Sequence, residues 1–188
     1  IEKLDGRRGS RDPAVRALAK RERADYKRFF GIVNKHLVIY SERSGFYKYY
    51  EALIDGLLKS SNITIHYITS DPDDAVFELA KTQPRIRPYY IGLKKLIPLM
   101  MRLDADMVAM TTPDLDTFYI KRSLVRKDAE YIYVPHDMMS IHMGFHKGAL
   151  DHFDTVFATG PHVEREIRST ERVYGLPEKT VVPFGYPL

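Results

Sequence analysis

From residue 36 onward, the chain alternates between short apolar runs and longer segments with helical spacing, which limits the folds it can adopt. The runs are rich in Val, Ile and Tyr, and they predict strands at residues 37–40, 63–68, 88–91, 107–110, 131–134, 155–158 and 181–184. Helices are expected at residues 46–59, 73–81, 93–103, 115–125 and 161–174. Apolar strands separated by helices favour a parallel sheet that is covered on both faces. We therefore expect a doubly wound, mostly parallel Rossmann-like α/β domain over residues 36–188.

Residues 1–35 have a different character, and we expect a flexible, basic lead-in over residues 1–11 followed by an amphipathic helix. Asp12 and Pro13 are typical of a helix start. Residues 1–30 hold ten Lys or Arg and five Asp or Glu, a net charge of +5 in a chain whose total is +4. The apolar positions of this helix are Val15, Leu18, Ala19, Tyr26, Phe29, Phe30 and Val33, with Glu22 as a gap. Two interpretations follow: a helix packed on its own domain, or a helix on an anionic membrane surface.

Composition and missing motifs exclude several classes of protein. The chain has no cysteine, which excludes disulfides, a thiolate nucleophile, Cys-ligated zinc and iron–sulfur clusters. No apolar run approaches the roughly 20 residues of a spanning helix. There is neither a Gly-x-Ser-x-Gly elbow nor a Walker A loop. Because the basic excess is confined to the N-terminal segment, we expect no nucleic-acid partner.

In doubly wound sheets, ligands bind where the strands end, and this rule selects the segments that could carry function. The loop over residues 41–45 could hold an anion at the start of the following helix with help from Arg43, or it could be a plain tight turn. It has one glycine where a dinucleotide fingerprint needs three, so no NAD or FAD is expected. The candidate binding residues at these strand ends are Arg43, Ser44, Gly45, Thr112, Asp114, Asp137, Ser140, His142, Gly160 and His162.

Histidines are concentrated in one part of the chain, with five of the seven at positions 136, 142, 146, 152 and 162. Imidazole titrates near neutral pH and suits general acid–base work. His136 directly follows the strand at 131–134, where Asp137 could orient it; a structural bond to the loop backbone is the alternative. His152 is expected on a helix surface or against the sheet.

No metal or cofactor is expected. His142 and His146 have the spacing of two ligands on a helix, but Gly144 lies between them and a third ligand is lacking. The acidic clusters at residues 71–74 and 114–116 could bind Mg²⁺ or Mn²⁺, but carboxylates before a helix are better explained as caps.

The order of short motifs provides a more specific indication. The motifs are ADMVAMTTPDLD at 105–116, YIKRS at 119–123, YIYVPH at 131–136, ALDHFD at 149–154, FATG at 157–160 and PFGYP at 183–187. Over residues 36–188 this order resembles the N-terminal half of the catalytic region in the CDP-glycerol glycerophosphotransferase family of bacterial teichoic-acid synthesis.

The resemblance implies a GT-B arrangement, in which two Rossmann-like domains face a cleft. The second domain binds the CDP-activated donor, and the first supplies the acceptor side and a histidine proposed as general base. His136 is similar to that histidine, although Asp137 stands where the family usually has glycine. The chain would then be a piece of a longer enzyme, inactive without its donor-binding domain.

The implied reaction transfers glycerol phosphate, or a related polyol phosphate, to a hydroxyl of a membrane-anchored cell-envelope polymer. The expected location is the cytoplasm, with peripheral attachment to the inner face of a bacterial membrane. Two alternatives stay open: a GT-B glycosyltransferase that uses a nucleotide sugar, and a non-catalytic domain that binds a membrane surface.

Overall fold

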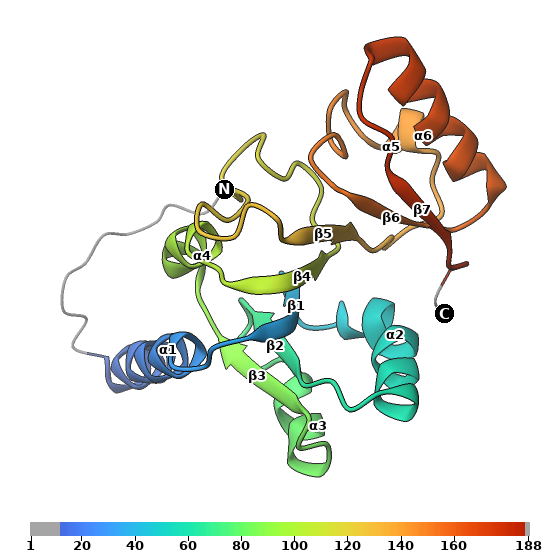
Figure 1. Ribbon diagram of the computed structural model, residues 1–188. Helices are drawn as coiled ribbons and strands as arrows, with labels where there is room; N and C mark the ends of the chain where they lie inside the picture. Colours follow the sequence, from blue (N-terminus) through green and yellow to red (C-terminus); the bar gives the residue numbers. More distant parts are fainter. Residues whose placement is uncertain (1–11, 187–188) are drawn as a thin grey trace.

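The computed structural model describes residues 12–186, so the lead-in expected at 1–11 and the last two residues lie outside the described part. Seven strands form one parallel sheet in the order β3-β2-β1-β4-β5-β6-β7 (Figure 1). The strands are β1 Lys35–Ser41, β2 Ile65–Thr69, β3 Ile86–Tyr90, β4 Ala105–Met110, β5 Glu130–Tyr133, β6 Thr155–Ala158 and β7 Thr180–Pro183. The helices are α1 Pro13–Phe30, α2 Tyr47–Ser60, α3 Val76–Thr82, α4 Leu93–Met101, α5 Ile141–Gly144 and α6 Pro161–Tyr174. The predicted doubly wound α/β fold is confirmed.

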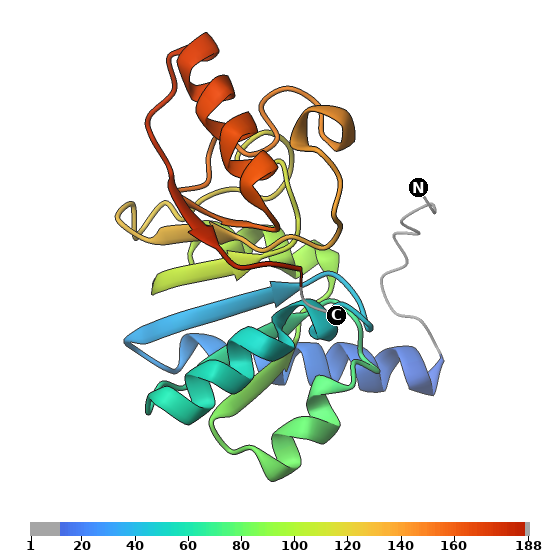
Figure 2. The same ribbon diagram turned by 90° about the vertical axis from the view of Figure 1, so that its right-hand side faces the viewer.

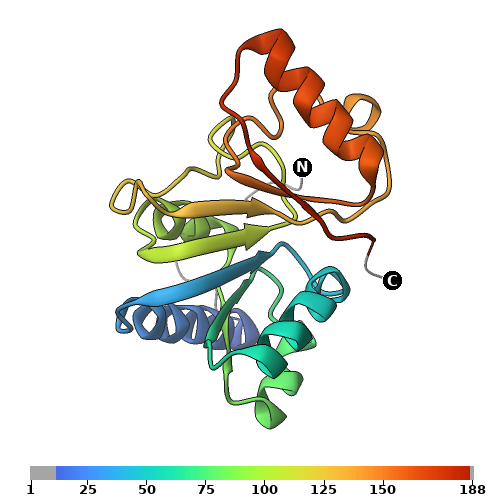
Figure 3. The same ribbon diagram turned by 45° about the vertical axis from the view of Figure 1, so that its right-hand side comes forward.

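Helices cover both faces of the sheet because the winding direction reverses between β1 and β4. The chain first moves outward from β1 to β3, with α2 and α3 on one face (Figures 2 and 3). It then returns to β4 and continues to β7, with α4 and α6 on the face that also carries α1. The point of reversal, where the β1 and β4 loops diverge, is where such sheets form a ligand crevice.

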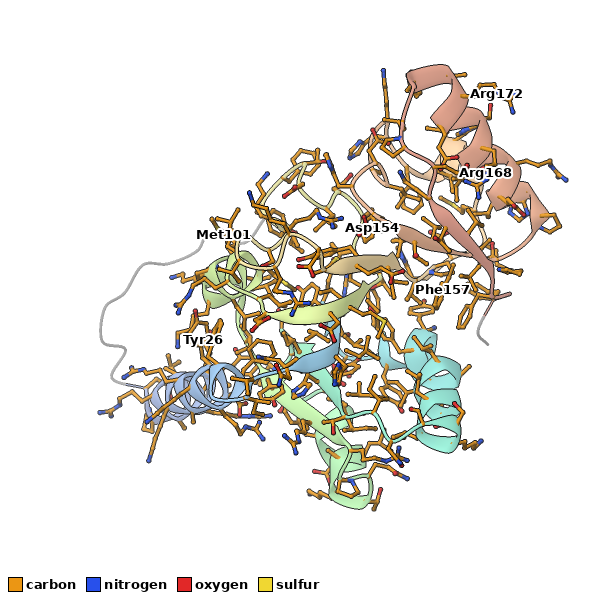
Figure 4. The ribbon with its side chains drawn as sticks, in the orientation of Figure 1. Tyr26, Met101, Asp154, Phe157, Arg168 and Arg172 are labelled. Atoms are coloured by element: carbon orange, nitrogen blue, oxygen red, sulfur yellow. The ribbon has the colours of Figure 1, made fainter. Side chains whose placement is uncertain are left out.

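Alternate residues of the central strands fill the two halves of the core. Val38 and Tyr40 of β1 pack toward α1 and α4, whereas Leu37 and Ile39 pack toward α2. All four side chains are almost completely buried. The sequences of the central strands are therefore continuously apolar and do not alternate between apolar and polar residues, as expected for a parallel sheet with two covered faces. Farther along the sheet, Phe157 of β6 lies on the face opposite α6 (Figure 4).

The prediction of a helix at residues 115–125 is wrong. Asp114 and Asp116 have left-handed backbone φ angles of 66° and 63°, which a right-handed helix cannot contain. The Asp116 carboxylate accepts a hydrogen bond from the backbone N–H of Arg122 at 2.9 Å, and this closes a compact loop. Such side-chain bonds to the backbone compete with helix formation. His152 was expected on a helix or against the sheet, and it lies instead in an exposed turn.

Helix α1 covers the edge strand β3 through polar side chains. Asp25 accepts a hydrogen bond from the backbone N–H of Tyr90 at 2.9 Å, and Glu22 accepts one from Gly92 at 3.0 Å. Arg28 donates to the backbone carbonyl of Pro88. Residues three apart lie on one face of a helix, so these three side chains can form hydrogen bonds with backbone groups along β3 that no neighbouring strand pairs. The helix thereby protects an edge strand that could otherwise pair with another chain.

The interpretation of α1 as a helix packed on its own domain is confirmed. Phe29 is fully buried in the core, whereas Val15 and Val33 at either end of the predicted stripe are 49% and 74% exposed. Arg21 stacks over the ring of Phe77, so part of the basic charge is used within the domain. Within residues 12–186, no helix has the length and apolarity needed to span a bilayer.

Candidate functional site

A cleft of about 370 Å³ lies at the carboxyl ends of β1, β4 and β5, next to the point where the winding reverses. Four predicted site residues line it: Arg43, Asp114, His136 and Asp137. Glu42 and His146 line it too, although neither was among the predicted binding residues. Glu42 could have been found from its place directly after β1, and His146 from the cluster of histidines. The cleft therefore joins loops that are far apart in sequence, from Glu42 after β1 to His146 after α5.

Aromatic side chains hold the His136 ring in place. The imidazole stacks on Phe46, with 5.9 Å between ring centroids and 23° between ring planes, and it meets Tyr49 edge-on at 6.1 Å. Nδ1 lies 3.3 Å from the hydroxyl of Tyr133. Nε2 has no hydrogen bond to a described residue, and the Asp137 carboxylate is 3.9 Å away. One ring nitrogen is thus engaged, and the other is available to a ligand.

The backbone of His136 has a structural role as well. Its carbonyl accepts a hydrogen bond of 3.2 Å from the hydroxyl of Tyr186, which ties the segment after β7 to the end of β5. The Asp137 carboxylate accepts a bond from the backbone N–H of Met139 and closes the turn that follows. The loop that presents His136 is therefore held at both ends.

His146 is chemically different from His136 because both of its ring nitrogens are engaged. Nε2 lies 2.6 Å from the Asp114 carboxylate, and Nδ1 lies 2.9 Å from the carbonyl of Lys147. The carbonyl of Lys147 and the Asp114 carboxylate raise the pKa of His146 above its ordinary value. An imidazole with two acceptors favours its protonated form, so His146 is suited to offset negative charge and poorly suited to accept a proton.

The remaining cleft charges come from the loop after β1. Glu42 accepts a hydrogen bond of 2.7 Å from the hydroxyl of Thr112 and so connects the ends of β1 and β4. Thr112 faces a neighbouring hollow of about 260 Å³, which also contains Phe118 and Tyr119. Arg43 is exposed and stacks on Phe46 at 5.3 Å. Arg43 and His146 place positive charge in a cleft whose carboxylates are those of Glu42, Asp114 and Asp137.

Ser44 and Gly45 form the tight turn before α2 and do not line the cleft. Gly45 has a φ of +86°, a conformation that favours glycine, and this explains its place in the turn. The backbone N–H of Ser44 donates to the Asp71 carboxylate at 3.1 Å. A protein carboxylate therefore binds one of the N–H groups that the sequence suggested for an anionic ligand.

Four more predicted residues lie away from the cleft: Ser140, His142, Gly160 and His162. The hydroxyl of Ser140 donates to Glu166 at 2.7 Å, and Nε2 of His142 lies 2.9 Å from the hydroxyl of Thr170. These bonds attach α5 to α6. Gly160 is the residue before α6, and His162 is in its first turn.

The acidic clusters differ from each other in structure. Asp74 accepts a hydrogen bond of 3.1 Å from the N–H of Val76, the first residue of α3, and so pairs one free N–H group at the helix start, although the N-cap position itself is Ala75. The interpretation of Asp114 and Asp116 as helix caps is wrong because no helix follows them. Among the described residues, no three or more His, Asp or Glu side chains are grouped so that they could hold a metal ion.

Comparisons of the chain with models of protein families, with curated proteins and with solved structures found no match. Function is therefore inferred from the geometry of the cleft and from the order of motifs in the sequence. Chemically, the cleft offers a fixed imidazole with one free nitrogen, two cationic groups and several carboxylates. This set of groups can bind a polar substrate, accept a proton from it and offset the charge of a phosphate.

Proposed function

We propose that residues 36–188 form the acceptor-side domain of a transferase. The enzyme would move glycerol phosphate, or a related polyol phosphate, from a CDP-activated donor to a hydroxyl group of a cell-envelope polymer. The observation that carries the proposal is the free Nε2 of His136, on a ring held by Phe46 and Tyr133 within the cleft at the strand ends. The resemblance of motif order to CDP-glycerol glycerophosphotransferases supports the choice of donor.

In the proposed reaction, the acceptor hydroxyl donates its hydrogen bond to Nε2 of His136. The hydroxyl oxygen attacks the phosphorus that carries glycerol, the bond from this phosphorus to the CMP oxygen breaks, and CMP leaves. The proton of the hydroxyl ends on Nε2. This step needs the tautomer in which Nδ1–H donates to the Tyr133 oxygen, because only then does Nε2 have a free lone pair.

The neighbouring charges suit this step. Asp137 lies 3.9 Å from Nε2 and would stabilise the imidazolium that forms when the proton is transferred. Arg43 and His146 would offset the charge of the transferring phosphoryl group. The donor nucleotide would bind mainly to a second domain.

A GT-B glycosyltransferase is the alternative enzyme, because removal of a proton from an acceptor hydroxyl requires the same base. The two enzymes differ in the donor that they bind, which is a CDP-polyol for the proposed transferase and a nucleotide sugar for the glycosyltransferase. Thermal unfolding of the full-length protein would be followed with CDP-glycerol, CDP-ribitol and common nucleotide sugars. The proposal expects a raised midpoint with a CDP-polyol and release of CMP when an acceptor is added. A midpoint raised by a nucleotide sugar alone would favour the glycosyltransferase, and no response to any donor would favour a non-catalytic domain.

Attachment to an anionic membrane is a second part of the proposal. It is supported by the exposed side chains of Lys20, Arg23 and Lys27 on α1. Arg21 and Arg28 are expected to add little to membrane binding, because the side chains of both already contact other parts of the domain. A polybasic surface of this kind binds anionic lipid in a salt-dependent way.

A further inference from the structure

A second cavity, of about 320 Å³, lies between α6 and the segment 141–151. Its wall is mostly apolar and includes Ile141, Phe145, Leu150, Ile167 and Leu176. Phe145 also borders the cleft that contains His136, so the two hollows are neighbours. The volume is at the lower end of the range for small-molecule pockets, about 300–1,000 Å³. An apolar hollow of this size on one side of a helix is large enough for a small ligand.

One buried cation lines this cavity. Lys179 directly precedes β7 and is only 7% exposed. Its ammonium donates a hydrogen bond of 3.1 Å to the backbone carbonyl of Asp151, and no carboxylate of a described residue forms an ion pair with it. Buried lysines are rare unless they are paired, because an ammonium loses its hydration when it is buried.

Two carboxylate residues line the cavity, the partly exposed Asp151 and the buried Glu171, and the charge of the buried one is already offset by another residue. Glu171 of α6 is 8% exposed and lies 2.9 Å from the guanidinium of Arg168, which projects from the same helix (Figure 4). Its other oxygen accepts the backbone N–H of Lys179 at 2.7 Å. The charge of Glu171 is therefore offset by Arg168, and the ammonium of Lys179, with one hydrogen bond to a described residue, has spare donors at the edge of a mostly apolar cavity.

We propose that this cavity binds a small amphiphilic monoanion, with an apolar body against the wall and one carboxylate accepting hydrogen bonds from Lys179. A single buried ammonium matches a single negative charge, whereas a dianionic phosphate would leave a charge uncompensated. At the rim, Lys147 stacks over the ring of Tyr174 at 3.9 Å and adds positive charge near the entrance. This site does not depend on the transferase chemistry at His136.

Calorimetric titration of the full chain with octanoate, octan-1-ol and octyl phosphate tests the site. The three probes share one apolar body and differ in the head group. A hydrogen bond to a charged group contributes about 1.5–3 kcal/mol, so octanoate should bind at least about tenfold more tightly than octan-1-ol. Equal binding of octanoate and octan-1-ol, or no binding of octanoate at millimolar concentration, would overturn the proposal. Tighter binding of octyl phosphate would overturn the assignment to a carboxylate.

Substitutions then locate the head group. Lys179→Met should weaken octanoate binding by about tenfold or more and leave octan-1-ol binding nearly unchanged. Lys179→Arg should keep most of the preference for octanoate. Lys59→Met, which changes an exposed lysine on α2 far from the cavity lining, is the control and should leave octanoate binding unchanged. Unchanged octanoate binding by Lys179→Met would contradict the proposal. If Lys179→Met does not fold, the comparison of the three probes on the unmodified chain still decides the question.

Discussion

The Nδ1 atom of His136 lies 3.3 Å from the hydroxyl oxygen of Tyr133, a residue three positions earlier in the chain. Burial raises the pKa of the Tyr133 phenol, so its hydroxyl stays protonated across the physiological range. It can accept the proton of Nδ1 as a hydrogen bond and so select the tautomer with a free Nε2. The end of β5 thus supplies both the proposed base and the group that orients it.

Under the proposed transferase function, we expect His136→Ala to lower kcat of the full-length protein by about 10²–10⁴-fold, the range typical of general-base catalysis. The KM for the donor should change little, because the donor is assigned to another domain. The measurement is the rate of CMP release from CDP-glycerol in the presence of the polymer acceptor.

The exposed His152→Ala serves as the control for that substitution and should keep normal turnover. Circular dichroism of both variants should match that of the unmodified protein. Near-normal turnover by His136→Ala would rule out His136 as the base.

Removal of positive charge from α1 should weaken attachment to anionic membranes. Each basic residue near such a surface contributes about 1 kcal/mol, so the triple variant Lys20→Gln, Arg23→Gln, Lys27→Gln should bind up to about 100-fold less tightly. Sedimentation with phosphatidylserine vesicles at low and high salt measures the change, and binding of the unmodified protein should fall as salt rises.

A matched variant replaces three exposed lysines on the α2 and α3 side of the sheet: Lys48, Lys59 and Lys81, each by Gln. It removes the same charge and should bind vesicles more tightly than the α1 variant. If the two variants lose the same vesicle affinity, then the total charge of the protein, rather than the position of charge on α1, determines binding.

Because α1 covers β3 through polar side chains, we expect the loss of a single carboxylate to lower the stability of the fold markedly. Asp25 is 8% exposed and accepts the backbone N–H of Tyr90, so Asp25→Ala would leave a buried N–H unpaired. We expect a loss of about 1–3 kcal/mol in the free energy of unfolding. Urea unfolding should show a lower midpoint with an unchanged slope. The exposed Asp55→Ala on α2 is the control, and the prediction fails if both variants lose the same stability.

Strands β1 and β2 could be predicted from the sequence because they are apolar runs that are buried on both faces. The edge strand β7 is only partly buried, and its short apolar run at Val181 and Val182 was still enough to predict it. The helix at Pro161–Tyr174 was predicted with its observed bounds, since Pro161 begins it and Gly175, with a left-handed φ of 63°, ends it. These signals are local. The helix expected at residues 115–125 is absent because the Asp116 carboxylate binds the backbone N–H of Arg122 and closes a loop. The sequence pattern does not encode this bond between side chain and backbone.

The cleft could be predicted only in part. The rule that ligands bind at strand ends found Arg43, Asp114, His136 and Asp137, which converge in space. The pairing of His146 with Asp114 depends on how the segment after α5 folds back over the loop after β4, and no sequence spacing encodes it. The unpaired Lys179 was missed for the same reason, because its burial results from the packing of α6 against the turn at residues 148–151.

A buried histidine gives the protein a specific dependence of stability on pH. His66 of β2 is 3% exposed, and its Nδ1 lies 3.0 Å from the hydroxyl of Tyr89. Burial, with the nearby charges of Lys35 and Arg87, lowers the pKa of His66 to about 4 from the ordinary value of 6.5. The folded protein therefore favours neutral His66, and the unfolded chain binds the proton more readily.

The sign of the effect follows from this difference in proton binding. The contribution of His66 to stability is fully present above pH 6.5 and is lost as the pH falls from 6.5 toward 4, because only the unfolded state gains a proton in that range. The full loss is about 3 kcal/mol. The free energy of unfolding in urea, measured between pH 7.5 and 4.5, should fall more steeply for the unmodified protein than for His66→Gln. His152→Gln, which changes an exposed histidine, should keep the steep dependence. Parallel pH profiles of the unmodified protein and His66→Gln would show that His66 does not titrate in this way.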